Sequence, residues 1–278
     1  MIALRPLFLA LCLLLPAQPV LPAGAGAQAA QEGPAGERAE SLGLAFAAGA
    51  PAVTVIDGDT LALADGREVR LVGIQAPKLP LGRTGFAAWP LAEEAKRKLE
   101  EVALGLPLDL GFGGRRGDRH GRVLAHLFDA EGRWIQGELL RAGLARVYSF
   151  ADNRGAIAEM LALEREARAA GRGIWGDPFY AVRDAAAAGD WLGGFELVEG
   201  RVHAVGRGGG RTYLNFAEDW RQDFTIALDR RTLELFAEDG LDLDSLAGKR
   251  LRVRGWLKSY NGPMIEVTHP EQIEVLED

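Results

Sequence analysis

Short runs of apolar residues separated by turn residues open the central part of the chain. Residues 52–56 and 61–64 are joined by Asp57-Gly58-Asp59-Thr60, and Asp65-Gly66 joins the second run to residues 68–74. An aspartate followed by a glycine between two apolar runs is a strong hairpin signal. The pattern therefore predicts a three-stranded meander.

Helical spacing begins after this meander. Trp89-Pro90 is typical of a helix start, because proline is tolerated in the first turn, and Leu91, Ala95 and Leu99 then recur on one face. Two further strands and two further helices are predicted at residues 106–112, 123–128, 135–143 and 156–171. This order predicts a small closed β-barrel of the OB type packed against three helices, within residues 50–180, and excludes a doubly wound parallel sheet.

The pattern changes after residues 185–189, an alanine-rich stretch that is either a linker or the end of a helix. Helical periodicity nearly vanishes, and a single helical stretch, residues 232–237, separates the third of five predicted strands from the fourth. These strands are expected at residues 195–205, 212–216, 223–228, 251–256 and 264–267. Five strands with a helix after the third is again the OB order, so we expect a second, mainly β, OB-like barrel over residues 190–278.

The first 49 residues contain an export pattern followed by a spacer. Arg5 precedes the apolar run 7–15, and small-residue steps of the A-x-A form follow, so residues 1–29 are predicted to be a signal peptide. An uncleaved membrane anchor would need a longer apolar run than Pro16 permits. We expect an exported protein, periplasmic or secreted, with no membrane span after signal removal, and we interpret residues 30–49 as a flexible tether.

The amino-acid composition excludes several classes of binding site and cofactor. The formal net charge of −7 excludes a basic coat wrapped around a duplex, so any nucleic acid site must be local. The acidity lies mainly in residues 181–278, where 12 basic and 18 acidic residues give −6. The single cysteine, Cys12, excludes a disulfide framework. The four histidines form no metal-binding pattern and no phosphate-binding glycine loop is present, so neither zinc nor a nucleotide cofactor is expected.

Four charged residues are candidates for phosphate chemistry. Asp57 and Asp59 place two carboxylates on one turn, which is either an ordinary hairpin turn or part of a site for a hard cation such as Ca²⁺. Arg70 and Arg122 each lie in a predicted strand among apolar residues. Each is either a solvated edge residue or a guanidinium fork that grips a phosphate.

Together these segments resemble the thermonuclease (staphylococcal nuclease) family over about residues 50–180. The resemblance rests on five ordered segments: Val55-Ile56-Asp57-Gly58-Asp59-Thr60-Leu61, Val69-Arg70-Leu71-Val72-Gly73-Ile74-Gln75-Ala76-Pro77, Asp118-Arg119-His120-Gly121-Arg122-Val123-Leu124-Ala125, Gly143-Leu144-Ala145 and Gly173-Ile174-Trp175. The family hydrolyses phosphodiester bonds of DNA and RNA with one Ca²⁺ on an OB-type barrel. By resemblance, Asp59 is the first carboxylate ligand of the metal, Arg70 and Arg122 clamp the phosphate, and Ala76 offers its backbone carbonyl.

The sequence departs from the family at two positions. Gln75 stands where the family has a second metal-binding aspartate, and Lys78 stands where it has the glutamate that activates or positions the attacking water. Lys78 cannot accept a proton while it is charged, and it would repel a cation beside it. Loss of a general base typically costs about 10²- to 10⁴-fold in rate. As an alternative role, the Lys78 ammonium replaces part of the missing metal charge as a phosphate ligand.

Other residues of the same region are candidate substrate contacts. Arg119 and His120 lie in the most basic stretch of the chain, and Tyr148 follows the second helix, where the family places aromatic residues near a bound base. The leading prediction is metal-assisted hydrolysis of single-stranded DNA or RNA with a depleted Ca²⁺ and base site. The alternative is a catalytically silent module that binds nucleic acid or a protein. The second barrel is expected to serve an unknown protein partner.

Overall fold

The structure is a computed structural model that describes residues 33–219 and 221–277. The predicted signal peptide, residues 1–29, lies outside the described residues. The described residues belong to one compact unit. Among the described residues, none of the helices has the length and apolar character needed to cross a bilayer.

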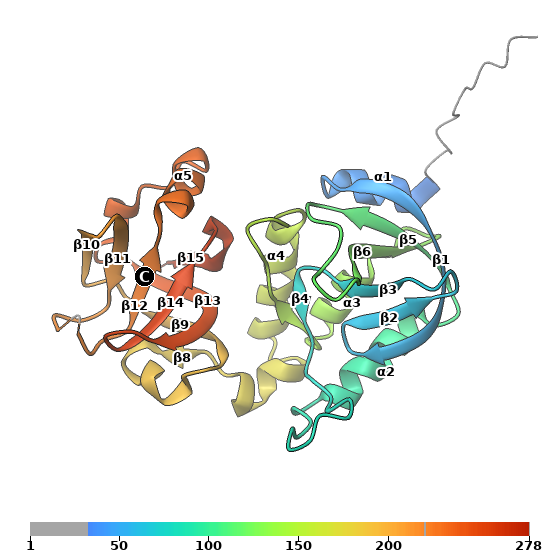
Figure 1. The fold of residues 1–278 in the computed structure, drawn as a ribbon, viewed down its shortest axis with the longest axis horizontal. Coiled ribbons are helices and arrows are strands. Elements are labelled where there is room, and N and C mark those ends of the chain that lie inside the picture. The colour runs from blue at the N-terminus through green and yellow to red at the C-terminus, as the bar shows by residue number, and fades with distance from the viewer. Residues whose placement is uncertain (1–32, 220, 278) are drawn as a thin grey trace, which may run out of the picture. The chain divides into compact units, whose positions relative to one another are not determined.

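The first part of the fold is a closed five-stranded barrel with helices against it, which confirms the predicted architecture (Figure 1). The strands follow the order β1-β2-β3-β6-β5, and all neighbours are antiparallel except β3 and β6. Their bounds are β1 Ala45–Asp57, β2 Thr60–Leu63, β3 Glu68–Leu71, β5 Pro107–Phe112 and β6 Val123–Asp129. The three predicted helices are α2 Ala92–Ala103, α3 Ile135–Arg141 and α4 Ile157–Ala169.

The barrel interior and the inner faces of these helices share one apolar core. Leu61, Val69, Leu99 and Leu127 are fully buried in it, as alternation in the strands and the helical spacing require. A separate two-stranded ribbon joins β4 (Ile74–Gln75) to β7 (Arg146–Val147), with Gln75 opposite Arg146. This ribbon places Gln75, one of the predicted metal-ligand positions, beside the chain segment that follows α3.

The interpretation of residues 33–49 as a flexible tether is wrong. Residues Gly33–Ser41 form helix α1, and the first part of β1 pairs with β5, with Ala45 opposite Phe112. Small residues are abundant here because this segment packs closely, not because it is free: a Cβ on Gly49 would lie 1.8 Å from the carbonyl oxygen of Leu108. Close packing and flexible spacers both select alanine and glycine, so composition alone does not separate them.

The second part is a mixed β-sheet with strands at the five predicted positions, but the first predicted strand is divided in two at residues 202–203, and two further strands, Arg183–Asp184 and Ile273–Leu276, were not predicted. Its order is β10-β11-β12-β14-β13-β9-β8, with β15 on β13 and a parallel pair between β12 and β14 (Figure 1). The strands are β8 Arg183–Asp184, β9 Phe195–Arg201, β10 Ala204–Gly208, β11 Arg211–Asn215, β12 Thr225–Leu228, β13 Arg250–Ser259, β14 Pro263–Val267 and β15 Ile273–Leu276. Helix α5 (Arg230–Glu238) follows the third predicted strand as expected, whereas closure of this sheet into an OB-like barrel stays a prediction.

At the boundary between the two parts, the structure favours the helical alternative for the alanine-rich stretch over the linker. The alanine-rich stretch forms a 3₁₀ helix, Ala185–Trp191, and Ala188 is completely buried in the second core. A buried ion pair also crosses from one part to the other, because Arg254 of β13 donates to both carboxylate oxygens of Glu164 on α4, at 3.0 and 2.9 Å. Arg254 also donates to the carbonyl oxygen of Val147. The second part therefore supports the ribbon that carries Arg146.

Candidate functional site

The turn between β1 and β2 is built for a close approach of the backbone to neighbouring elements. The Asp57 carboxylate accepts a hydrogen bond from the Asp59 amide at 3.1 Å, which fixes the turn. A Cβ on Gly58 would lie 2.7 Å from the side chains of both Ala76 and Ala95. Glycine is therefore required here, and the turn is held against the start of the chain segment that carries Lys78.

Asp59 lies at the centre of a buried charge cluster. The Lys78 ammonium donates to both of its carboxylate oxygens, at 2.6 and 2.9 Å, and the Ala76 amide donates to one of them at 2.8 Å. Arg70 lies 3.2 Å from the same carboxylate, and Lys78 lies 3.9 Å from Asp57. Asp59 is fully buried, so its compensation comes from these partners and not from solvent.

The titration of this cluster follows from burial and from the neighbouring charges. Burial alone would raise the pKa of Asp59, but Arg70 and Lys78 outweigh it and lower the pKa to about 2. Burial, together with the nearby Asp59 charge, raises the pKa of Asp57. Burial also lowers the pKa of Lys78, although Asp59 opposes this effect. The Asp59–Lys78 pair is therefore an ion pair at neutral pH.

The side-chain oxygen of Gln75 is not available to this charge cluster. Its side-chain oxygen accepts two hydrogen bonds from Arg146, at 3.0 and 2.8 Å. Arg146 is itself buried, its guanidinium lies 4.8 Å from the ring centroid of Phe195, and burial lowers its pKa to about 10. An amide oxygen at position 75 thus serves as the acceptor for a buried arginine.

The two predicted phosphate-clamping arginines line one open cleft of about 510 Å³. Arg70 is held in place by backbone carbonyls, donating to Leu71 at 2.6 Å and to Ile74 at 2.7 Å. Arg122 is oriented by Asp118, which accepts from its Nε at 2.7 Å. The other predicted substrate contacts line the same cleft, namely Arg119, His120 and Tyr148, together with Phe150.

The comparisons with known proteins concern the barrel and the helices packed against it. The family model for staphylococcal nuclease homologues matches residues 68–177. Those residues are a staphylococcal nuclease homologue domain. Two proteins named "Uncharacterized endonuclease", from Escherichia coli and Escherichia coli O157:H7, are each 29% identical to this chain over 128 residues, which cover 45% of this chain and 75% of each relative. The matched range contains Arg70, Gln75, Lys78 and Arg122, whereas Asp59 precedes it on the same barrel.

The residues of the nuclease homologue domain do not fit the Ca²⁺ that the family implies. Ca²⁺ takes six to eight oxygen ligands, but both Asp59 oxygens are bound to Lys78 and the Gln75 oxygen is bound to Arg146. The backbone carbonyl of Ala76 and the second oxygen of Asp57 are too few to form a site. Within the described residues, no group of three or more acidic, histidine or cysteine side chains is placed to hold a metal ion.

The structure thus divides the predicted site residues into two sets. Arg70, Arg119, His120, Arg122 and Tyr148 line the cleft, whereas Asp57, Asp59, Gln75, Ala76 and Lys78 lie outside its lining. Arg70 alone joins the two sets, because it lines the cleft and contacts Asp59.

Sequence reasoning missed two residues that shape this region of the domain. Arg146 sits between Ala145 and Val147 in an apolar strand, which is the same signal that singled out Arg70 and could have identified it. Glu164 lies on the inner side of α4, fully buried, and accepts a hydrogen bond from the Val147 amide at 2.6 Å. Its partner Arg254 is 90 residues away in the sequence. No local pattern would have revealed that pair.

Proposed function

We propose that the nuclease homologue domain binds single-stranded nucleic acid in the cleft between Arg70 and Arg122, and does not use Ca²⁺ to cleave it. One observation carries the proposal: the Lys78 ammonium is bound to both oxygens of Asp59, where the family would have a divalent cation. An internal cation in this position removes the need for a metal to neutralise the buried carboxylate. It also leaves no carboxylate at position 78 to act on a water molecule.

The cleft itself supports binding of a phosphodiester. Arg70 and Arg122 both border it, and planar guanidinium groups match phosphate oxygens in a bidentate geometry. Tyr148 and Phe150 lie next to them, with ring centroids 4.9 Å apart, and Phe150 is 48% exposed. An exposed ring beside cationic groups, as at Phe150, favours unpaired bases, which stack on it without sequence preference.

The test is binding of a short fluorescent oligothymidylate, measured by anisotropy in EDTA and then in CaCl₂. We expect the same affinity in both conditions and no cleavage product in CaCl₂. Arg122→Ala should weaken binding roughly tenfold, because it removes one phosphate contact. Arg141→Ala is the matched control, since Arg141 also pairs with an acidic residue but lies on α3, outside the lining of the cleft. Cleavage that needs CaCl₂ and stops in EDTA would contradict the proposal.

A double variant tests whether positions 75 and 78 determine the metal requirement. Gln75→Asp with Lys78→Glu restores both acidic residues of the family pattern and removes the ammonium from Asp59. We expect this variant to bind Ca²⁺ and to cleave the oligonucleotide only when Ca²⁺ is present. If the double variant cleaves no better than the native protein, then another feature of the cleft prevents hydrolysis.

One observation favours a second candidate, which is hydrolysis without metal. His120 lines the cleft together with both arginines, and histidine is the side chain most often used as a general base. Cleavage in EDTA that is lost in His120→Ala but retained in the exposed-loop control Arg83→Ala would establish this activity. The absence of cleavage in EDTA leaves the binding function as proposed.

Export is the remaining part of the proposed function. It rests on Arg5, the apolar run at residues 7–15 and the small residues after it. In cells that produce the full chain, the processed protein should be recovered outside the cytoplasm, and its N-terminus should lie within residues 25–32. Recovery of unprocessed protein in the cytoplasm would contradict export.

A further inference from the structure

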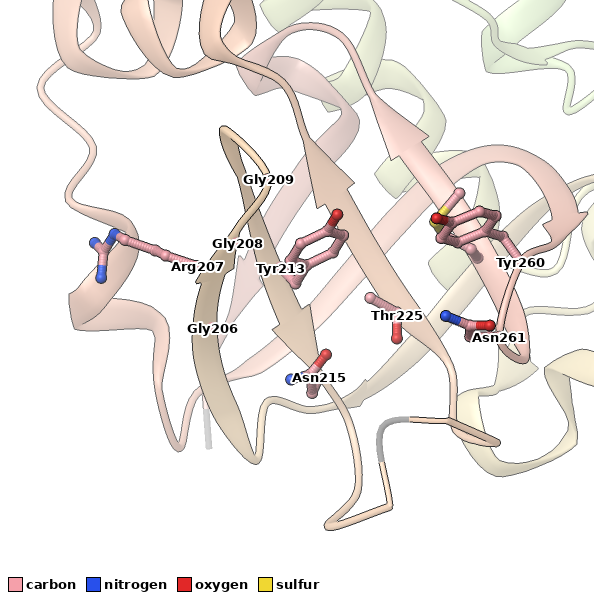
Figure 2. A pocket seen from close by; sticks show the side chains of 10 residues that line it. Gly206, Arg207, Gly208, Gly209, Tyr213, Asn215, Thr225, Tyr260 and Asn261 are labelled. Carbon is pink, nitrogen blue, oxygen red and sulfur yellow. The ribbon is translucent and has the colours of Figure 1, made fainter.

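The second sheet carries a pocket of about 540 Å³ that is separate from the nuclease cleft. It lies on β10, β11, β12 and β14 and on the loop at residues 260–261. Figure 2 shows Tyr213 and Tyr260 standing at either side of it, with Thr225 between them and Asn215 and Asn261 along one edge. A volume of this size is typical of sites for small ligands.

Two glycines of β10, Gly206 and Gly208, keep this pocket open. Gly206 is paired with Tyr213 across the strands, and Gly208 is paired with Arg211. A Cβ on Gly206 would meet only the Asn215 side chain, at an ordinary distance of 3.6 Å, and a Cβ on Gly208 would meet nothing within 4 Å. The fold therefore does not require glycine at these two positions. Their effect is to leave the face of the sheet beside Tyr213 uncovered.

The polar groups of the pocket are available to a ligand. Across the described part of the chain, no hydrogen bond is formed by the side-chain amides of Asn215 and Asn261 or by the hydroxyls of Tyr213 and Tyr260. An amide both donates and accepts, as does a tyrosine hydroxyl. Tyr260 is 61% exposed, so its ring is not needed for the core.

The charges around the pocket do not favour a polyanion. Among the described residues that line the pocket, Arg207 is the only charged one. It donates to both carboxylate oxygens of Asp244, at 2.7 and 2.8 Å, and points away from Tyr213 in Figure 2. The nearby cations Arg211 and Lys258 are both paired with Glu266, each at 3.1 Å. Each of these three cations is already paired with a carboxylate, so the phosphates of a nucleic acid strand would have to compete with that carboxylate for it.

We propose that this pocket binds an uncharged saccharide, a ligand unrelated to the proposed function of the nuclease cleft. A sugar ring has an apolar face of C–H groups, which suits the flat rings of Tyr213 and Tyr260. Its hydroxyl groups both donate and accept hydrogen bonds, which suits the amides of Asn215 and Asn261. The ligand is neutral, so the paired state of the surrounding charges is no obstacle.

The test uses the full mature chain and four neutral tetrasaccharides: β-1,4-linked N-acetylglucosamine, β-1,4-glucose, β-1,3-glucose and α-1,4-glucose. Binding is followed by tyrosine and tryptophan fluorescence and by calorimetry. We expect at least one of them to bind with an affinity that does not change between low and high salt. Tyr260→Ala and Asn215→Ala should each weaken binding about tenfold or more. Arg230→Gln, at an exposed position on α5 outside the lining of the pocket, should leave it unchanged.

Each contrary outcome overturns the proposal. If none of the four saccharides binds, the pocket is not a saccharide site. If a short oligothymidylate binds instead, is lost in Tyr260→Ala and weakens with salt, the pocket is a nucleic acid site. Binding that survives both Tyr260→Ala and Asn215→Ala places the saccharide elsewhere on the molecule. The exposed position of Tyr260 allows its replacement without loss of the fold, which a thermal melt confirms.

Discussion

Replacing Lys78 with methionine tests whether its ammonium is the counter-ion of Asp59. The variant keeps the length and most of the volume of the side chain but removes a charge that lies 2.6 and 2.9 Å from the two oxygens of a fully buried carboxylate. Loss of one partner of a buried pair typically costs about 3–5 kcal/mol. Arg70 and the Ala76 amide still contact Asp59, so we expect a somewhat smaller loss, about 2–3 kcal/mol, at pH 7.

The pH dependence of the free energy of unfolding gives an independent value for what the charged Asp59 contributes to stability. The pKa of Asp59 is about 2 in the folded protein against an ordinary 3.8, and this difference corresponds to about 2 kcal/mol of stability. Because the folded pKa is the lower one, this stability is fully present above about pH 4 and is lost as the pH falls toward 2. The free energies of unfolding of the native protein and of Lys78→Met should therefore converge over the same pH range.

The assay is urea unfolding followed by tryptophan fluorescence at several pH values between 2 and 7. Lys98→Met is the matched control: Lys98 is 24% exposed, close to the 20% of Lys78, but its partner Glu101 is 68% exposed. A pair with an exposed partner contributes about 0–1 kcal/mol. The reasoning is refuted if Lys78→Met is no less stable than Lys98→Met, or if its loss of stability persists unchanged at pH 2.

Three further outcomes follow from buried groups elsewhere. Arg254→Met should lower the free energy of unfolding by about 3–5 kcal/mol in urea denaturation, because it leaves the buried carboxylate of Glu164 without its main partner. The control is Arg250→Met, at a position that is 52% exposed, which should cost about 1 kcal/mol or less. Burial lowers the pKa of His126 to about 3, so the free energy of unfolding should fall as the pH drops from about 6.5 toward 3. His126→Phe should flatten this part of the curve of stability against pH. An unchanged slope in the variant would contradict this. Gln75→Asp alone should pair with Arg146 and leave calorimetric Ca²⁺ binding no stronger than in the native protein.

The sequence allowed the barrel, its helices and most strands of the second part to be predicted, because each depends on local periodicity and turns. It did not reveal β8, β15 or the break between β9 and β10. The pair Asp57 and Asp59 and the two arginines of the cleft, Arg70 and Arg122, were also recognisable from local motifs. What could not be predicted depends on long-range contacts. The contact between Gln75 and Arg146 spans 71 residues, and only the folded chain shows that the amide oxygen is already occupied.

The formal charges of the site explain why Gln75 and Lys78, the two departures from the acidic residues of the family pattern, are compatible with each other. In this protein the cluster contains two carboxylates, Asp57 and Asp59, and two cations, Arg70 and Lys78, so it is neutral without a metal. Gln75 adds no charge, and Arg146 satisfies its oxygen. Acidic residues at both positions would leave a surplus of buried negative charge that only a bound cation could neutralise. A lysine at position 78 supplies that cation covalently, and the same lysine removes the electrostatic attraction that would draw Ca²⁺ to the turn.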